Sequence, residues 1–77
     1  MIGVICAMAI EAQSFIERLT DCREEKILNI SFWEGKLEEK SVVVTVSGVG
    51  KVSAGIATAL MIEHYRPSLI INSGIAG

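Results

Sequence analysis

The chain has 77 residues, a formal net charge of −2 and a hydrophobic content of 51%. A domain of this length buries only about 60% of the surface that its unfolded chain exposes, so the chain forms one small domain at most. Its mean hydropathy of +0.50 is high for such a domain and indicates the interior-rich part of a larger one. The few, scattered basic residues argue against nucleic-acid and anionic-membrane binding.

Targeting and redox signals are also weak. No apolar run reaches the roughly 18 residues of a membrane-spanning helix. The apolar N-terminus has no basic residues before it and runs directly into Glu11, which favours a buried strand over a signal peptide. Cys6 and Cys22 lack metal-site or CxxC spacing, so we expect reduced thiols in a cytoplasmic protein.

The first elements follow from the change of hydrophobic period. Residues 2–7 are apolar without alternation, which is typical of a strand covered on both faces. Residues 9–19 place apolar side chains at helical spacing and predict an amphipathic helix. The next residues, 20–26, are polar and predict a solvated connection.

The middle of the chain predicts two strands. Leu28, Ile30 and Phe32 alternate with polar residues, which indicates a half-exposed strand. Gly35 then marks a bulge or bend. Residues 38–40 form a polar turn into a buried strand at 41–46, although Glu-Glu-Lys is not a favoured hairpin sequence.

The last part predicts a helix and a strand. Residues 51–65 are small or apolar all round, so this helix is buried on several sides or packs on a partner subunit. Arg66-Pro67 ends it, and residues 69–72 form another buried strand. The order β-α-β-β-α-β predicts an α/β domain with parallel pairing. Because two helices cannot cover four strands, we expect residues 1–77 to be an incomplete domain.

The segment Ser47-Gly48-Val49-Gly50-Lys51 lies between a strand and a helix. It is not a Walker A loop, because Thr45 and Val52 occupy the positions where glycine and a hydroxyl residue are needed. It also lacks the acidic residue about 20 positions on that a dinucleotide fingerprint has. Two interpretations stay open: a tight turn without a ligand, or helix N-terminal amides that bind an anion or a ribose oxygen.

Glu11 is the carboxylate of most interest. It lies in the first helical turn after a buried strand, where it either complements the helix dipole or faces a ligand and deprotonates a water. His64 fits a cation near a helix C-terminus, and without a second histidine we expect no metal site. Ser47 and Ser73 lack the Gly-x-Ser-x-Gly context of a serine nucleophile.

Four segments stand in an order and spacing that are specific in combination, namely residues 2–11, 33–37, 47–51 and 72–77. Together they resemble the N-terminal third of the bacterial 5′-methylthioadenosine/S-adenosylhomocysteine nucleosidases, of the purine nucleoside phosphorylase superfamily. The resemblance implies a three-layer α/β/α fold with a mixed, mainly parallel sheet. It implies hydrolysis of the N-glycosidic bond to adenine, without a metal or organic cofactor. The family and the apolar helix at 52–62 both point to a homodimer.

The resemblance also implies roles for individual residues. The residue matching Glu11 activates the attacking water near the ribose. The implied substrate contacts are Met8 on the ribose, Val49 at the 5′-thio substituent, Ile75 near the sugar, and Ala76 and Gly77 beside adenine. Family members often have serine where this chain has Ile75, so that hydroxyl contact is missing. The family's aspartate that assists adenine departure and its ribose-binding Met-Glu pair match positions beyond Gly77.

Two alternatives to a nucleosidase stay open. A nucleoside phosphorylase of the same superfamily would need a phosphate site, yet the arginines of this chain, Arg18, Arg23 and Arg66, are distant in sequence from the glycine segments. This favours water as the nucleophile. The second alternative is that the chain is a non-catalytic fragment or binding module that keeps the fold. We expect the isolated 77 residues to be inactive, because the residue that protonates adenine is missing.

Overall fold

The computed structural model describes residues 1–48 and 51–73. Within them, five strands form one sheet in the order β2-β3-β4-β1-β5. The elements are β1 (Ile2–Cys6), α1 (Ala9–Ile16), β2 (Thr20–Ile27), β3 (Ile30–Leu37), β4 (Lys40–Val46), α2 (Lys51–Tyr65) and β5 (Leu69–Ser73). Strand β1 pairs in parallel with β4 and β5, whereas β2, β3 and β4 pair antiparallel. The expected mixed α/β sheet is confirmed.

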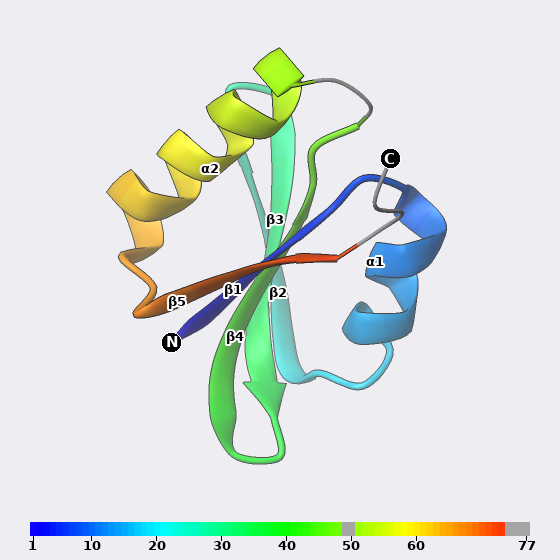
Figure 1. Cartoon of the computed structure of the whole chain (residues 1–77). Coiled ribbons are helices and arrows are strands. Elements are labelled where there is room, and N and C mark those ends of the chain that lie inside the picture. Colours follow the sequence, from blue (N-terminus) through cyan, green and yellow to red (C-terminus); the bar gives the residue numbers. More distant parts are fainter. Residues whose placement is uncertain (49–50, 74–77) are drawn as a thin grey trace.

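The two helices lie on opposite faces of the sheet and give three layers (Figure 1). On the α1 face the buried core consists of Val4, Cys6, Ala12, Leu19, Val42 and Val44. On the α2 face it consists of Ile5, Phe32, Val43 and Met61. Successive residues of β1 and β4 thus point to different cores. These strands are apolar without alternation because both of their faces are buried.

The prediction for residues 20–26 was wrong, because they form the edge strand β2 rather than a solvated connection. Their hydrogen-bonding partner is β3, and the side chains of Thr20–Lys26 are exposed. Only Ile27 at the end of this edge strand packs against a core, so the rest of the strand needs no apolar face. Charged residues along such an edge also discourage pairing with another chain. The pairing therefore leaves no hydrophobic pattern in the sequence.

The assignment of Leu28 and Asn29 to a strand was also wrong. They form the two-residue turn between β2 and β3, with φ angles of 51° and 66°. Two positive φ angles are what the favoured two-residue hairpin turn requires. The side chain of Leu28 is 77% exposed, so its place in the apolar alternation was accidental. The turn predicted at residues 38–40 is confirmed for Glu38 and Glu39, which have φ angles of 51° and 71° between β3 and β4, whereas Lys40 already begins β4.

Gly35 marks a bulge, but the extra residue lies in the neighbouring strand. The register between β2 and β3 shifts between Thr20 and Arg23, opposite Gly35. A Cβ atom on Gly35 would lie 2.9 Å from the Thr20 carbonyl oxygen and 3.0 Å from Leu19 Cβ. The glycine therefore permits the close approach of the bulged backbone.

Replacing Gly35 by alanine is expected to lower the free energy of unfolding by about 1–3 kcal/mol, because the added methyl group overlaps the bulge. The matched control is Gly55→Ala in α2, where a Cβ atom would meet nothing within 4 Å. That change is expected to stabilise the protein by about 0.5–1 kcal/mol. Urea unfolding followed by circular dichroism measures both. Equal stability of the two variants would contradict this account of Gly35.

The helices agree with the prediction in type and differ in extent. Helix α1 ends at Ile16 rather than at residue 19, although Leu19 still packs in the core. Helix α2 has the predicted bounds but buries one face only, through Ala57 and Met61. Its outer face exposes Val52, Ile56 and Ile62. The predicted burial of α2 on several sides within the chain is therefore wrong. Its packing on a partner subunit stays a prediction. No helix within residues 1–48 and 51–73 is long and apolar enough to cross a membrane.

Candidate functional site

The parallel strands end together at one edge of the sheet, which we call the carboxyl edge. Cys6, the last residue of β1, lies in register with Val46 of β4 and Ser73 of β5. The connection through α1 leads to one side of β1 and the connection through α2 to the other. In open α/β sheets, ligands bind outside the carboxyl ends of the strands where the winding changes direction. The carboxyl edge is therefore the candidate site.

Helix α1 places Glu11 at this edge. Met8 is the N-cap residue, with an extended backbone, and lies two residues after the end of β1. The Met8 backbone N–H donates a hydrogen bond of 3.2 Å to Oε1 of Glu11. The carboxylate thus neutralises part of the positive helix end. This contact agrees with the helix-dipole interpretation of Glu11. It also holds the carboxylate in one position.

The hydrogen bond to Met8 leaves acceptor capacity on Glu11. Among the described residues, the Glu11 carboxylate accepts one hydrogen bond, from the Met8 backbone N–H to Oε1, and Oε2 accepts none. The side chain is half-buried. A carboxylate in this state can accept a hydrogen bond from a water or a hydroxyl group and can act as a general base.

The Cys6 thiol, at the end of β1, lies near Glu11 and feels its charge. Burial raises the pKa of the Cys6 thiol, and the negative charge of Glu11 raises it further. A hydrogen bond with the Ser73 hydroxyl acts in the opposite direction. The thiol is thus close to Glu11 and to the end of β5. The sequence did not predict Cys6 as a site residue, because only the strand register brings it beside these two groups.

Ser47 connects the ends of β4 and β1. Its backbone N–H donates to the Cys6 carbonyl oxygen over 2.8 Å. Its hydroxyl donates to the carbonyl oxygens of Gly48 and Cys6 over 3.0 and 3.4 Å. Gly48 follows at φ +78°, a left-handed conformation that favours glycine. Ser47 thus bonds the end of β4 to the end of β1, while Val49 and Gly50 lie outside the described residues, so both interpretations of the segment stay open.

The structure brings two of the predicted site residues together, Glu11 and Met8. Met8 is exposed and could cover an apolar part of a ligand. The other four, Val49, Ile75, Ala76 and Gly77, lie outside the described residues. In the described part of the chain, no group of three or more histidine, cysteine and acidic residues could hold a metal ion.

The three arginines lie away from the carboxyl edge, whereas Lys51 begins α2 there. Arg18 follows the C-terminal end of α1, Arg66 follows that of α2, and Arg23 lies in the edge strand β2. All three are thus remote from the segments that directly follow β1 and β4. The described residues at this edge provide the Glu11 carboxylate and the exposed Met8 side chain, which suit a ligand with hydroxyl groups and an apolar part.

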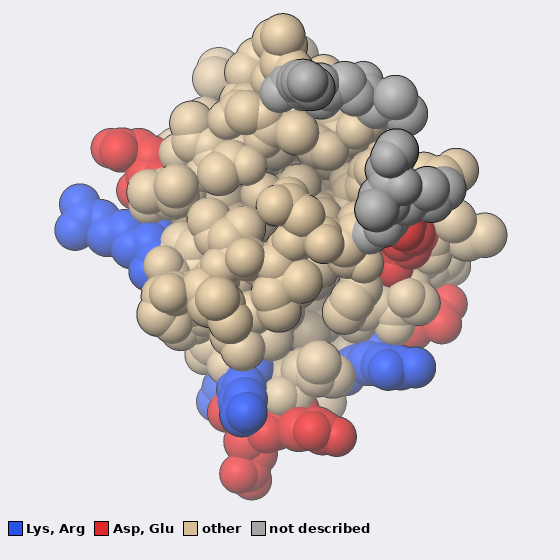
Figure 2. Space-filling view, in the orientation of Figure 1, with Lys and Arg blue, Asp and Glu red and all other residues tan. Residues whose placement is uncertain are grey.

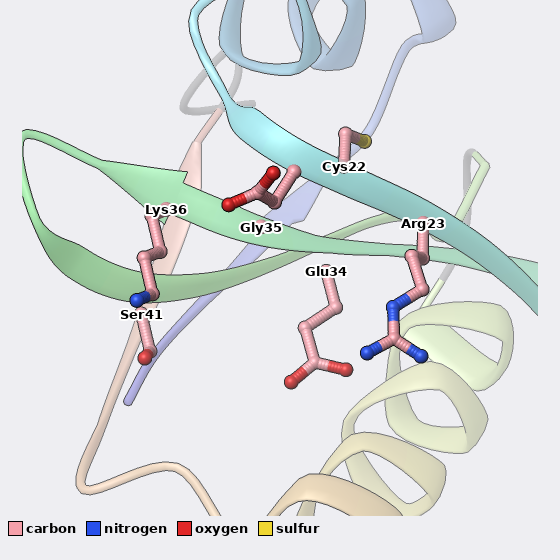
Figure 3. A pocket seen from close by; sticks show the side chains of 7 residues that line it. Cys22, Arg23, Glu34, Gly35, Lys36 and Ser41 are labelled. Carbon is pink, nitrogen blue, oxygen red and sulfur yellow. The ribbon is translucent and has the colours of Figure 1, made fainter.

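A hollow of about 500 Å³ lies elsewhere (Figure 3). Its lining consists of Asp21, Cys22, Arg23, Glu34, Gly35, Lys36 and Ser41. These residues belong to β2, β3 and the first part of β4, whose Val42 lies in register with Ile2 at the start of β1. The hollow is therefore away from Glu11 and contains none of the predicted site residues.

Comparisons with known proteins identify relatives of similar sequence and fold. A family model described as the phosphorylase superfamily matches residues 1–77. The 5′-methylthioadenosine/S-adenosylhomocysteine nucleosidase of Staphylococcus haemolyticus is 49% identical over 77 residues, which are 100% of this chain and 34% of that protein. The nucleosidase of the same name from Shewanella loihica is 49% identical over 76 residues, which are 99% of this chain and 33% of that protein.

Solved structures are similar as well. A Colwellia psychrerythraea nucleosidase of this kind, in complex with adenine, has a TM-score of 0.95 and 37% identity, over 99% of this chain and 31% of that one. The Streptococcus pneumoniae nucleosidase with a transition-state inhibitor has a TM-score of 0.93 and 32% identity, over 99% and 33%. The chain spans about a third of the length of these relatives. Because the family model matches all of its residues, the chain belongs to the phosphorylase superfamily.

Proposed function

We propose that this chain supplies the water-activating part of a nucleosidase that releases adenine from 5′-methylthioadenosine and S-adenosylhomocysteine. The observation that carries the proposal is the Glu11 carboxylate, held by the Met8 N–H at the carboxyl edge. The names of the relatives and the adenine in the Colwellia psychrerythraea structure support the substrate class. Residues 1–77 would form the N-terminal part of one nucleosidase domain.

The proposed reaction is the hydrolysis of the bond between C1′ of ribose and N9 of adenine. Breaking this bond builds positive charge on the sugar, which a nearby carboxylate stabilises. Glu11 takes a proton from the attacking water as the oxygen bonds to C1′, and adenine leaves with the electrons of the broken bond. The leaving adenine takes up a proton from an acid that lies outside residues 1–77.

The remaining predicted residues would form the substrate contacts. Met8 would cover the ribose, and Val49 would face the 5′-thio substituent. Ile75, Ala76 and Gly77 would lie along the sugar and adenine. A neutral nucleoside needs no phosphate-binding arginine, which accords with the positions of the three arginines.

A chimera tests the proposal. In it, residues 1–77 replace the matching third of the Staphylococcus haemolyticus nucleosidase, which is 49% identical. We expect adenine release from methylthioadenosine at the same rate with and without phosphate, and free methylthioribose as the second product. Chromatography of the products measures both. Phosphate-dependent turnover with 5-methylthioribose-1-phosphate as the product would identify a phosphorylase instead, and a folded but inactive chimera would contradict the proposal.

We also propose that the protein is a cytoplasmic homodimer. The exposed apolar side chains Val52, Ile56 and Ile62 form a face of α2 that a second copy can cover. Both cysteines are free, which accords with a reducing compartment. Sedimentation of the chimera is expected to give a dimer, and Ile56→Asp is expected to shift it towards the monomer. A monomeric chimera would contradict the homodimer.

A further inference from the structure

Cys6 is a buried thiol at the carboxyl edge that the proposed reaction does not use. Its side chain is fully buried, with 0% exposure. Its backbone lies between Val46 of β4 and Ser73 of β5, and its carbonyl oxygen accepts a hydrogen bond of 2.8 Å from the Ser47 N–H. The end of β1 is therefore held in place from both sides, and an element that packs on it has to adjust to it.

Helix α1 packs on this part of the sheet through Ala12. Ala12 is the buried residue of α1, with 1% exposure, and it belongs to the same core as Cys6. Its methyl group has no other rotamer, so extra volume in this core has to be accommodated by a shift of the helix backbone. Ala12 directly follows Glu11, and the N–H groups of Glu11 and Ala12 donate to the Met8 carbonyl oxygen over 3.2 and 3.3 Å. A shift at Ala12 therefore moves Glu11 as well.

The Cys6 thiol is neutral beside the Glu11 carboxylate. Burial raises the pKa of Cys6 and the charge of Glu11 raises it further, whereas the Ser73 hydroxyl lowers it. Glu11 is half-buried and every other acidic side chain is exposed. Figure 2 shows charged side chains around the rim of the face that α2 and β5 form, with none in its middle. A neutral thiol does not repel the carboxylate, and as a weak donor it leaves the acceptor sites of Glu11 to a water.

We propose that Cys6 is a positioning residue for Glu11, and that the size of the side chain at position 6 decides where the carboxylate lies at the carboxyl edge. This inference rests on the proposed function, because the placement affects turnover only if Glu11 activates a water. A displacement of about 1 Å at a reacting group can cost on the order of 10²-fold in rate. A side chain larger than cysteine would therefore lower kcat more than it would change substrate binding.

Cys6→Val in the chimera tests the inference. Valine adds a carbon atom to the core below α1, and we expect kcat to fall about 10- to 100-fold with KM nearly unchanged. Cys6→Ser keeps the shape of cysteine, and we expect it to keep most of the turnover. The matched control is Val42→Ile, which adds a carbon atom to the same core at the other end of the sheet, where Val42 pairs with Ile2. We expect near-normal kcat from this control, and urea unfolding compares the stability of the three variants.

A titration of Cys6 tests its contact with Glu11 without any assay of activity. The chimera is isotope-labelled at Cβ of cysteine for NMR, and the signal that Cys6→Ser removes belongs to Cys6. We expect Glu11→Gln to lower the pKa of Cys6, because the substitution removes a negative charge that raises it. Glu17→Gln, at the other end of α1, is the control and should leave this pKa unchanged.

The outcomes separate this inference from the proposed function. Normal kcat of Cys6→Val in an active chimera would overturn the inference and leave the proposed function intact. Equal losses of kcat in Cys6→Val and Val42→Ile would assign the effect to stability and would overturn it too. An unchanged Cys6 pKa in Glu11→Gln would remove the contact on which it depends. An inactive chimera in which Glu11→Gln still lowers the Cys6 pKa would support the placement of Glu11 beside Cys6 and contradict the nucleosidase assignment.

Discussion

Glu11→Gln in the chimera is expected to lower kcat by about 10²–10⁴-fold, the usual contribution of a positioned general base. Glutamine keeps an oxygen that can accept the Met8 N–H, so the helix end stays capped. The lost negative charge costs only about 0.3–1 kcal/mol of stability at the helix N-terminus. The loss should therefore appear in kcat, with KM and the folded structure nearly unchanged.

The matched control for this variant is Glu17→Gln. Glu17 lies at the other end of α1, is exposed, and accepts a hydrogen bond from Gln13 over 3.3 Å. It carries the same charge on the same helix, but it is away from the carboxyl edge. We expect near-normal turnover from this control in the steady-state adenine assay. Near-normal turnover of Glu11→Gln as well would remove Glu11 from the mechanism.

The isolated chain of 77 residues is expected to release no measurable adenine, whereas the chimera does. Adenine is a poor leaving group until a ring nitrogen is protonated, and loss of a general acid alone costs about 10²–10⁴-fold. In the proposed nucleosidase further ribose contacts would also come from outside residues 1–77, so the combined loss would be larger. The measurement is adenine formation over hours at high protein concentration. Turnover by the isolated chain that disappears on Glu11→Gln would refute the expectation.

Most of the fold could be predicted because burial leaves a periodic signal. Strands β1 and β4 point side chains into both cores, and their apolar runs show it. The edge strand β2 could not be predicted, because it pairs with β3 through backbone hydrogen bonds and the side chains of residues 20–26 are exposed. The turn at Leu28 could not be predicted either, because a hydrophobic pattern does not distinguish an exposed leucine from a buried one.

Part of the candidate site could also be predicted from the sequence, and part could not. The position of Glu11 in a first helical turn after a buried strand was visible in the sequence, and the structure adds its contact with Met8. The proximity of Cys6 to Glu11 and Ser73 was not visible, because it depends on the register of β1 and β5. The assignment of a nucleoside to this edge came from the family resemblance rather than from hydrophobic periodicity.

The hydrogen bond between Met8 N–H and Glu11 Oε1 has a consequence for the timing of the proposed reaction. A carboxylate that has taken a proton from water is a weaker acceptor than the ionised group. The first turn of α1 would therefore loosen when the sugar has just been attacked, and tighten when the proton leaves. Proton transfer to Glu11 would thus be coupled to the order of the N-terminal end of α1.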